Sequence, residues 1–579
     1  MTFTAPVAEQ SFVLETVADI GGLSRLPAYE AASADLVQAI LEEAGKLASG
    51  VFAPLNRIGD EEGAVWRDGE VTLPEGFAAA YRQYVEGGWG SLGADAAYGG
   101  QGMPFVLASA VQEQLTAANM AFSLCMMLTQ GAIEALAAHA SDEQKQTYLT
   151  KLVSGEWTGT MNLTEPQAGS DVGALRTRAE PHADGSYRIK GSKIFITWGE
   201  HDVADNIVHL VLARLPDAPG GTKGISLFIV PKYLQDGTRN DVRCVSIEHK
   251  LGIHASPTCT MSFGDDGNCV GYLVGAENAG MRAMFTMMNH ARINVGLQGV
   301  AVAERAYQAA LGYAKARVQG KRIIEHADVR RMLMTMKATT EAIRALAYLN
   351  AAAVDRAHGE TDADARREAQ ALADLLTPVT KGYATDMGVE IASIGIQIHG
   401  GMGFIEETGA AQHLRDARIA PIYEGTNGIQ ALDLVNRKLP QGRWKTLFAE
   451  MREFIRTLPG DGDLGALKPY LDDGLSALEN ATVWLVGNQG DGAADAAAGA
   501  TPYLRMFGIV MGGYLLARQA VAANGRLGAG EGDPAFLAAK IATARFFAEQ
   551  VIPQATALLG PVTRGAGTMF ALSEEQFGA

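Results

Sequence analysis

The sequence predicts a mainly helical α+β protein, in which a β domain lies between two helical blocks and a helical tail follows. Three observations predict this fold class. Apolar residues recur with a helical period from Asp35 to about residue 157, and that period returns at Gly280. Between these regions, short runs rich in β-branched and aromatic residues alternate with Gly, Asp and Pro turns. The runs follow one another without intervening helices, which favours an antiparallel β domain over a parallel doubly wound sheet.

The first two predicted parts are an N-terminal arm, residues 1–35, and a helical domain, residues 36–158. The first helix of this domain places Leu36, Ile40 and Leu41 on one face, which identifies the side that packs on the core. A glycine-rich loop follows at residues 98–104. Because no strand precedes it and no Lys-Ser/Thr pair follows it, the loop does not predict a phosphate site.

The remaining three parts are a β domain, a helical bundle and an appended helical domain. The β domain comprises residues 159–279, with predicted strands at 187–191, 194–197, 206–213 and 225–230. The bundle comprises residues 280–440, and its four helices are predicted from 280 to beyond 316, at 327–358, at 362–395 and after Gly425. The appended helical domain comprises residues 441–579, with flexible linkers at 488–492 and 524–534.

Composition narrows the classes of function. The formal net charge of −17 argues against nonspecific binding to nucleic acid or to an anionic membrane. Four cysteines without CxxC spacing favour a reducing compartment over a disulfide scaffold or a zinc site. The N-terminus has no signal-peptide pattern, and the longest apolar run, near 506–517, is too short to span a bilayer. We therefore expect a cytoplasmic protein with no metal and no integral membrane segment.

Glu424 is the candidate catalytic residue. It lies between the apolar stretch 419–423 and the small polar turn 425–428, just before a helical pattern that begins at Ile429. An apolar surround destabilises an ionised carboxylate and makes it a stronger base than a solvated one. A Glu before a Gly is also an ordinary solvated turn residue. The catalytic interpretation therefore depends on other motifs in the chain.

Four further segments contain more small and hydroxylated residues than packing requires. Residues 161–171 form a turn whose amides and hydroxyls can face an anionic or amide-like ligand. Residues 193–199 present aromatic and hydroxyl groups at a strand end, and residues 312–320 place an arginine at a helix end. Residues 397–404 contain glycines that let the backbone approach a flat or phosphorylated group. A Gly pair at that place also fits a helix C-cap.

Taken together and in this order, these segments resemble the acyl-CoA dehydrogenase family over about residues 36–440. The resemblance implies the fold of that family. Its N-terminal arm and helical tail are similar to the longer branch, which includes 3-methylmercaptopropionyl-CoA dehydrogenases and some long-chain acyl-CoA dehydrogenases. The matching motifs are Met161-Asn162-Leu163-Thr164-Glu165-Pro166 with Ala168-Gly169-Ser170-Asp171 for the flavin loop, Lys193 to Thr197 for the strand beside the flavin, Gln397 to Phe404 for the glycine segment, and Tyr423-Glu424-Gly425-Thr426 for the catalytic loop.

The resemblance implies FAD as the cofactor. Thr164 would hydrogen-bond the flavin pyrimidine edge beside backbone groups of Met161 and Leu163, and Thr197 would lie near flavin N5. Phe195 stands where many members have Trp and would shield the flavin face. Met161 stands where many have Tyr, so only its backbone role carries over. Contacts to the FAD pyrophosphate, or to the adenylate half of a neighbouring subunit's FAD, are implied for Gly169, Ser170, Arg317, Gln397, Gly400, Gly401, Thr426, Asn427 and Gly428.

The activity implied by the resemblance is α,β-dehydrogenation of an acyl-CoA thioester to the trans-2-enoyl-CoA. Glu424 would remove the α-proton and flavin N5 would accept the hydride. The Glu424 amide and a flavin ribityl hydroxyl would stabilise the developing enolate at the thioester carbonyl. Electron-transferring flavoprotein would accept the electrons, and a site shared by two subunits would require at least a homodimer. The implied substrate contacts are Ser170, Asn289, Arg292, Tyr423 and Gly425.

Two alternatives stay open. An acyl-CoA oxidase, which passes electrons to dioxygen, would share nearly every residue named above. A flavin-binding member without catalytic activity, serving a DNA-associated or regulatory role, is disfavoured by the charge of −17 and by the presence of Glu424. A nicotinamide Rossmann enzyme is disfavoured because no GxGxxG follows a strand. We expect His254 and His399 to be hydrogen-bonded loop residues.

The acyl group also stays open between 3-methylmercaptopropionyl and a medium or long straight chain. Pocket depth depends on packing around Met126, Met127 and residues 284–288, which residue spacing does not reveal.

Overall fold

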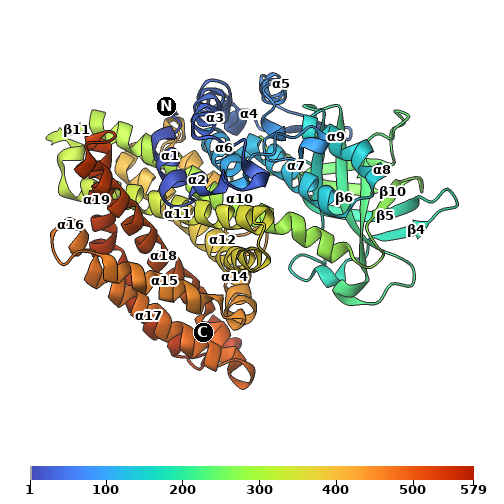
Figure 1. Ribbon diagram of the computed structural model, residues 1–579. Coiled ribbons are helices and arrows are strands. Elements are labelled where there is room, and N and C mark those ends of the chain that lie inside the picture. Colours follow the sequence, from blue (N-terminus) through green and yellow to red (C-terminus); the bar gives the residue numbers. More distant parts are fainter. Residues whose placement is uncertain (1–2) are drawn as a thin grey trace.

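The computed structural model describes residues 3–579, apart from the side chains of Asn289 and Asp491. The predicted N-terminal arm contains helix α1 (Val7–Thr16), which packs on the helices behind it (Figure 1). Ser33 caps the N-terminus of α3 (Ala34–Leu47), because its Oγ accepts a hydrogen bond from Leu36 N at 3.4 Å. The other longer helices of this block are α4 (Ala53–Glu62), α5 (Phe77–Glu86), α6 (Phe105–Ala118) and α7 (Met120–His139).

The β domain is a mixed sheet rather than the fully antiparallel one that the sequence predicts. Strands β3 and β4 each run parallel to β6. A parallel pair needs a long crossover, and β4 and β5 supply part of it here, so no helix marks it in the sequence. The strands are β3 (Trp157–Asn162), β4 (Arg178–Pro181), β5 (Tyr187–Thr197), β6 (Asn206–Arg214), β7 (Ile225–Pro231), β8 (Val242–Ile247), β9 (Thr258–Phe263) and β10 (Val270–Val274).

Part of the sheet closes on itself. β10 pairs with both β7 and β5, so β10, β7, β6, β4 and β5 close into a ring. The two predicted strands 187–191 and 194–197 are the single strand β5, whose register against β9 shifts between Lys193 and Ile196. This irregularity accompanies a left-handed backbone at Phe195, where φ is +58°.

The C-terminal bundle contains three long helices side by side, α10 (Gly280–Ala316), α11 (Ala327–Gly359) and α12 (Ala363–His399). The fourth, α14 (Asn427–Asp433), is short and contacts α12. α12 extends four residues beyond its predicted end at 395, because Gly400 with φ +61° is the residue that ends it. A shorter helix, α13 (Ala410–Ala417), leads towards Glu424.

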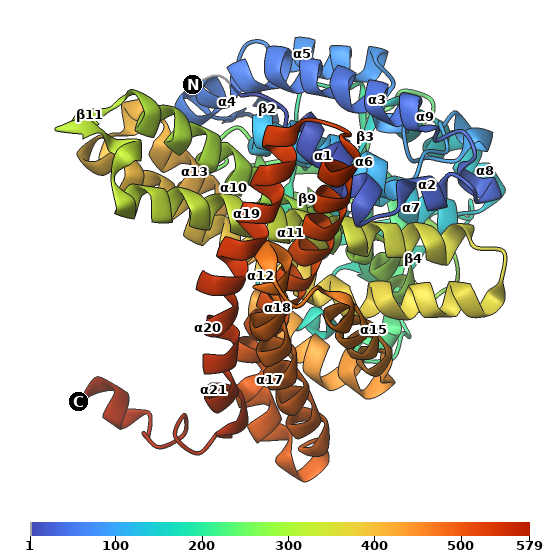
Figure 2. The same cartoon turned by 60° about the vertical axis from the view of Figure 1, so that its left-hand side comes forward.

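The tail forms its own helical layer against α11 and α12 (Figures 1 and 2). Its main helices are α15 (Arg443–Thr457), α17 (Lys468–Gly487), α18 (Ala493–Ala529) and α19 (Pro534–Gln550). The predicted linker 524–534 is wrong in its first half, because α18 continues to Ala529 and ends at Gly530, where φ is +73°. By length and composition α7 and α18 could each cross a membrane, but 83% of each apolar stretch is buried inside the protein.

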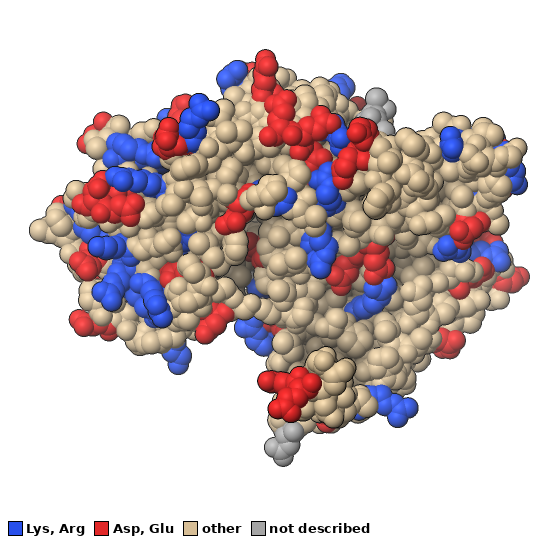
Figure 3. Space-filling model, turned by 180° about the vertical axis from the view of Figure 1, so that it is seen from behind, with Lys and Arg blue, Asp and Glu red and all other residues tan. Residues whose placement is uncertain are grey.

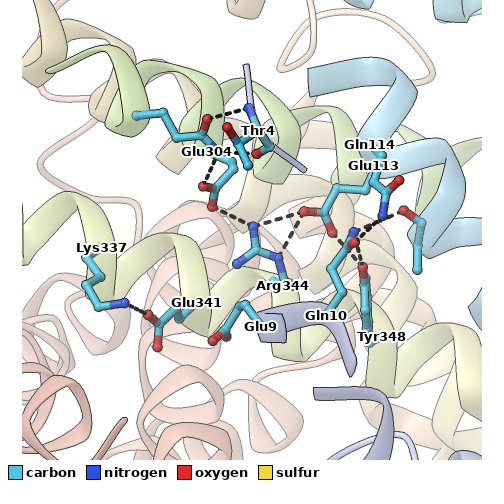
Figure 4. A network of polar contacts seen from close by, with 12 residues as sticks. Thr4, Glu9, Gln10, Glu113, Gln114, Glu304, Lys337, Glu341, Arg344 and Tyr348 are labelled. Carbon is cyan, nitrogen blue, oxygen red and sulfur yellow. Dashed lines mark hydrogen bonds and ion pairs between the residues drawn. The ribbon is translucent and has the colours of Figure 1, made fainter. Parts of the chain in front are cut away.

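A buried network of charges joins the arm and the tail to the bundle, and Figure 4 shows its members on the arm, α6 and the bundle. Lys540 Nζ, on α19, lies 2.7 Å from Glu9 Oε1 on α1 and 2.7 Å from Glu341 Oε2 on α11. Arg344, one helical turn along α11 from Glu341, pairs with Glu113 on α6 and with Glu304 on α10. On the outer surface, acidic and basic side chains are interspersed over the face drawn in Figure 3.

Candidate active site

Glu424 lies in the loop between α13 and α14, in a backbone conformation that non-glycine residues rarely adopt. Its φ is +56°, and Gly425 follows with φ +80°. Two hydrogen bonds fix the loop, from Ile422 N to Ile419 O at 2.8 Å and from Asn427 N to Pro421 O at 3.0 Å. Left-handed conformations of this kind are costly and cluster at functional sites. The loop therefore holds the carboxylate in a defined place.

Charge and burial act on Glu424 in opposite directions. The residue is half-buried, and burial raises the pKa of its carboxyl above 4.5, whereas Arg292 on α10 and Lys381 on α12 lower it. Arg292 is itself buried, and its Nε has no hydrogen-bond partner among the described residues. The site therefore combines a carboxylate of raised pKa with two cations from the bundle.

Lys381 contacts the loop directly. Its Nζ donates to Gly425 O at 2.8 Å and to Asn427 Oδ1 at 2.9 Å. Burial lowers the pKa of Lys381 to about 7, although Glu424 and Asp386 favour its charged form. Sequence analysis missed this residue. The available signal was a single lysine inside the otherwise apolar and small-residue stretch from Leu375 to Thr385.

Tyr423, a predicted substrate contact, has its hydroxyl committed within the protein. The hydroxyl donates to Gln298 Oε1 on α10, and Gln298 Nε2 lies 3.5 Å from Met127 Sδ on α7. Burial raises the pKa of Tyr423 above its ordinary value. Only the ring of Tyr423 is thus free to border a substrate. The predicted contact at Asn289 lies outside the described side chains.

A buried ion pair shapes the flavin-like loop after β3. Glu165 accepts hydrogen bonds from Arg176 N at 2.7 Å, from Thr177 N at 3.0 Å and from Thr177 Oγ1 at 2.6 Å. Lys193 Nζ, from β5, lies 2.9 Å from Glu165 Oε1 and donates to Leu163 O at 2.9 Å. The loop is also tied to β5 by Ile194 N, which donates to Thr164 O at 2.9 Å.

The residues around this loop fit a bound flavin nucleotide. Phe195 exposes 58% of its surface beside the loop although it is a large aromatic. Gly169 and Ser170 are exposed, a side chain at Gly169 would meet only open space, and no described residue accepts a hydrogen bond from Ser170 N–H. An open aromatic face with free amide donors beside it suits a flat ring that carries a phosphate group. Met161, Leu163, Thr164 and Thr197 are partly exposed in the same region.

The other predicted cofactor residues form two further groups. Thr426 caps α14 by accepting from Ile429 N at 3.3 Å, and the Asn427 amide is turned inward to Asp386 Oδ1 (2.7 Å) and Gly382 O (3.0 Å). Gly428 is exposed. The second of these groups lies at the C-terminal end of α10, beside strand β11 (Val318–Gln319). This end is far from the β domain in Figure 1. Its members, all exposed, are Arg317, Gln397, Gly400 and Gly401.

The two histidines considered from the sequence are both hydrogen-bonded. His254 Nδ1 lies 2.8 Å from Asp60 O and Nε2 lies 3.0 Å from Lys250 O. His399 Nδ1 lies 2.7 Å from Gly395 O, and its ring packs against Tyr313. Within the described residues, no group of three His, Cys, Asp or Glu side chains could hold a metal ion.

A cavity of about 60 Å³ lies between α6, α7 and α10. α7 and α10 run antiparallel here, because Met127 contacts Gln298 while Glu134 Oε2 lies 3.5 Å from His290 Nδ1. Gln130 and Asn294 lie between these two contacts and line the cavity. The cavity therefore starts about one helical turn from the Tyr423–Gln298 contact. Met126 and Met127 are buried core residues and do not line it.

The chain matches four family models in succession. Models described as acyl-CoA dehydrogenase N-terminal, middle and C-terminal domains match residues 37–156, 160–265 and 278–439. A model described as acetyl-CoA dehydrogenase C-terminal like matches residues 447–573.

Known proteins match over most of the chain. A 3-methylmercaptopropionyl-CoA dehydrogenase of Ruegeria pomeroyi is 48% identical over 577 residues, which covers 96% of this chain and 97% of that protein. A chain in the solved structure of the electron transferring flavoprotein of Acidaminococcus fermentans has 28% identity and a TM-score of 0.58, covering 69% of this chain and 96% of that one. An acyl-CoA dehydrogenase complexed with FAD from Bacillus anthracis shares the fold, with 21% identity, a TM-score of 0.72, and coverage of 97% and 89%.

Proposed function

The chain belongs to the acyl-CoA dehydrogenase family, and on that premise we propose that Glu424 is the base of an FAD-dependent α,β-dehydrogenation of an acyl-CoA thioester. The observation that supports the assignment of this residue is the Glu424 loop itself. A half-buried carboxylate with a raised pKa is held at φ +56° near two cations. A carboxylate of raised pKa is more basic than a solvated Glu, which suits removal of a weakly acidic α-proton.

The chain's own residues supply positioning and charge. Glu424 accepts the α-proton on its carboxylate, and Arg292 and Lys381 favour the ionised form of that carboxylate. The Glu424 backbone N–H would donate to the thioester oxygen and stabilise negative charge as it develops there. The Tyr423 ring borders the reacting carbons and excludes water, because its hydroxyl is fixed to Gln298.

FAD would lie against the loop after β3 and the exposed face of Phe195. The proposed contacts are the backbone groups of Met161, Leu163 and Thr164, together with Thr197 and Ser170. When bound, FAD supplies the acceptor for the hydride that leaves Cβ. The group at Arg317, Gln397, Gly400 and Gly401 lies at the C-terminal end of α10, beside β11 and on the side away from the β domain (Figure 1). It would serve the FAD of a second copy, so we propose a homodimer.

Two acyl classes fit the proposal. The 48% identical relative is named for 3-methylmercaptopropionyl-CoA, a short chain that contains sulfur. A cavity of about 60 Å³ suits a short chain better than a long one. We therefore propose 3-methylmercaptopropionyl-CoA first and short to medium straight chains second. We further propose electron-transferring flavoprotein as the electron acceptor and the cytoplasm as the location.

Anaerobic bleaching of the flavin absorbance tests the proposal. The purified holoprotein is mixed with a panel of acyl-CoAs, with the Glu424→Gln variant as the matched comparison. We expect bleaching by at least one acyl-CoA in the wild type and flavin that stays oxidised in Glu424→Gln. Equal bleaching in both proteins would assign the base to another residue. A protein that binds flavin but is bleached by no acyl-CoA would be a non-catalytic member of the family.

A further inference from the structure

We propose that Lys381 is a positioning residue for the base, holding the loop after Glu424 against α12 and placing a positive charge near the Glu424 carboxylate. This inference rests on the proposed role of Glu424. The ammonium group is fully buried and makes two hydrogen bonds to the loop, at 2.8 Å to Gly425 O and at 2.9 Å to Asn427 Oδ1. Both acceptors lie within three residues of Glu424.

Further hydrogen bonds from Asn427 to α12 fix the geometry of the contact between Lys381 and the loop. Asn427 Nδ2 donates to Gly382 O at 3.0 Å, to Thr385 Oγ1 at 2.9 Å and to Asp386 Oδ1 at 2.7 Å. The side chain therefore has its donors and its oxygen committed to α12. We accordingly assign Asn427 to this clamp rather than to the cofactor site that family resemblance implies. A two-point attachment of this kind would fix the left-handed backbone of Glu424 and Gly425.

Burying a charged lysine costs more free energy than burying a neutral hydrogen-bond donor. The charge of Lys381 therefore needs an explanation beyond its contacts with the loop. A side-chain amide could donate to the same two oxygens through its two N–H bonds, without the cost of burying an ammonium group. What the charge adds is an interaction with Glu424, since Glu424 favours charged Lys381 and Lys381 favours charged Glu424. The charged groups facing this pair are Arg292 on α10 and Asp386 on α12. Arg292 in turn faces Asp433 at the end of α14 and Arg437 just after it.

The two roles predict different effects. Loss of the charge raises the pKa of Glu424, so the acid limb of the bleaching rate moves to higher pH, by about one unit. Loss of the attachment misplaces the carboxylate and slows the rate at every pH, by about 10- to 100-fold. A purely structural lysine would affect neither quantity in an enzyme that keeps its flavin and its melting temperature.

The experiment measures the anaerobic bleaching rate from pH 5 to 9 for the holoenzyme and four variants, with flavin content and melting temperature recorded for each. Lys381→Met removes both roles, and Lys381→Arg keeps the charge. Asn427→Ala keeps the lysine but removes one of its two acceptors. Lys540→Met is the matched control, because Lys540 is equally buried but pairs with Glu9 and Glu341, away from the Glu424 loop.

We expect Lys381→Met to show the slower rate and the shifted acid limb, Lys381→Arg to keep the wild-type acid limb, and Asn427→Ala to be slower without any shift. Should Lys381→Met fail to retain flavin, the other two variants still decide the question. A wild-type profile in Lys381→Met or in Asn427→Ala, or a shifted acid limb in Lys381→Arg, would overturn the proposal. An active Glu424→Gln would instead refute the proposed base, so the two failures are distinguishable.

Discussion

Lys193 Nζ lies 2.9 Å from Glu165 Oε1 and 2.9 Å from Leu163 O, and both side chains are almost completely buried. The pair joins the middle of β5 to the loop that follows β3. The loop residues that family resemblance assigns to the flavin, Leu163 and Thr164, are held by this pair and by the Thr164 O–Ile194 N hydrogen bond. The ion pair thus holds in place the loop that forms the proposed flavin site.

Lys193→Met should weaken flavin binding and stability together. Removal of one partner leaves Glu165 buried without its counter-ion, a change that typically costs about 3–5 kcal/mol. Lys190→Met on the same strand is the control, because Lys190 is exposed. Flavin affinity by fluorescence titration and the free energy of unfolding would be compared. Equal values for the two variants would show that the pair does not support the loop.

The same pair predicts a dependence on acid pH. Burial alone would raise the pKa of Glu165, but Lys193 and the hydrogen bonds from Thr177 and Arg176 outweigh it and lower the pKa from 4.5 to about 2. A carboxyl whose pKa falls on folding stabilises the protein above its unfolded pKa, and this contribution is lost as pH falls from about 4.5 towards 2. The stability difference between wild type and Glu165→Gln should therefore shrink over that range. A difference that stays constant with pH would contradict the prediction.

Lys540→Met should separate stability from catalysis. Lys540 compensates two buried carboxylates, and its removal would leave Glu9 and Glu341 facing each other, at a cost of about 3–5 kcal/mol. Arg545→Met on the same helix is the control, because the ion pairs of Arg545 are exposed and contribute about 0–1 kcal/mol. Melting curves should show a large shift for Lys540→Met only, with an unchanged bleaching rate per bound flavin below the transition.

Sequence periodicity and motifs were enough for the fold class and the family, and both are confirmed by the matched family models and fold. They were not enough for features set by tertiary contacts. The parallel pairing of β3 with β6 depends on a crossover that contains strands, and the helical state of 524–529 depends on packing of α18 against α19. Lys381 and Gln298 carry no local motif, because their importance comes from contacts with residues 44 and 125 positions away.

Asn294→Leu should change the preference for the acyl group. Asn294 is 7% exposed and lines the cavity beyond Tyr423, and its Oδ1 has no hydrogen-bond partner among the described residues; Ser109 Oγ in the same wall has none either. Buried polar atoms left without partners disfavour a purely apolar chain, because each costs about 1–3 kcal/mol when water is displaced.

Leucine at position 294 removes that cost. The kcat/KM for butyryl-CoA should therefore rise by about tenfold relative to that for a 3-hydroxyacyl-CoA, whose hydroxyl can donate to Asn294 Oδ1. Ser109→Ala, which removes a hydroxyl without filling space, should move the ratio in the same direction by less. An unchanged ratio in both variants would place the acyl chain outside this cavity, nearer to Met127.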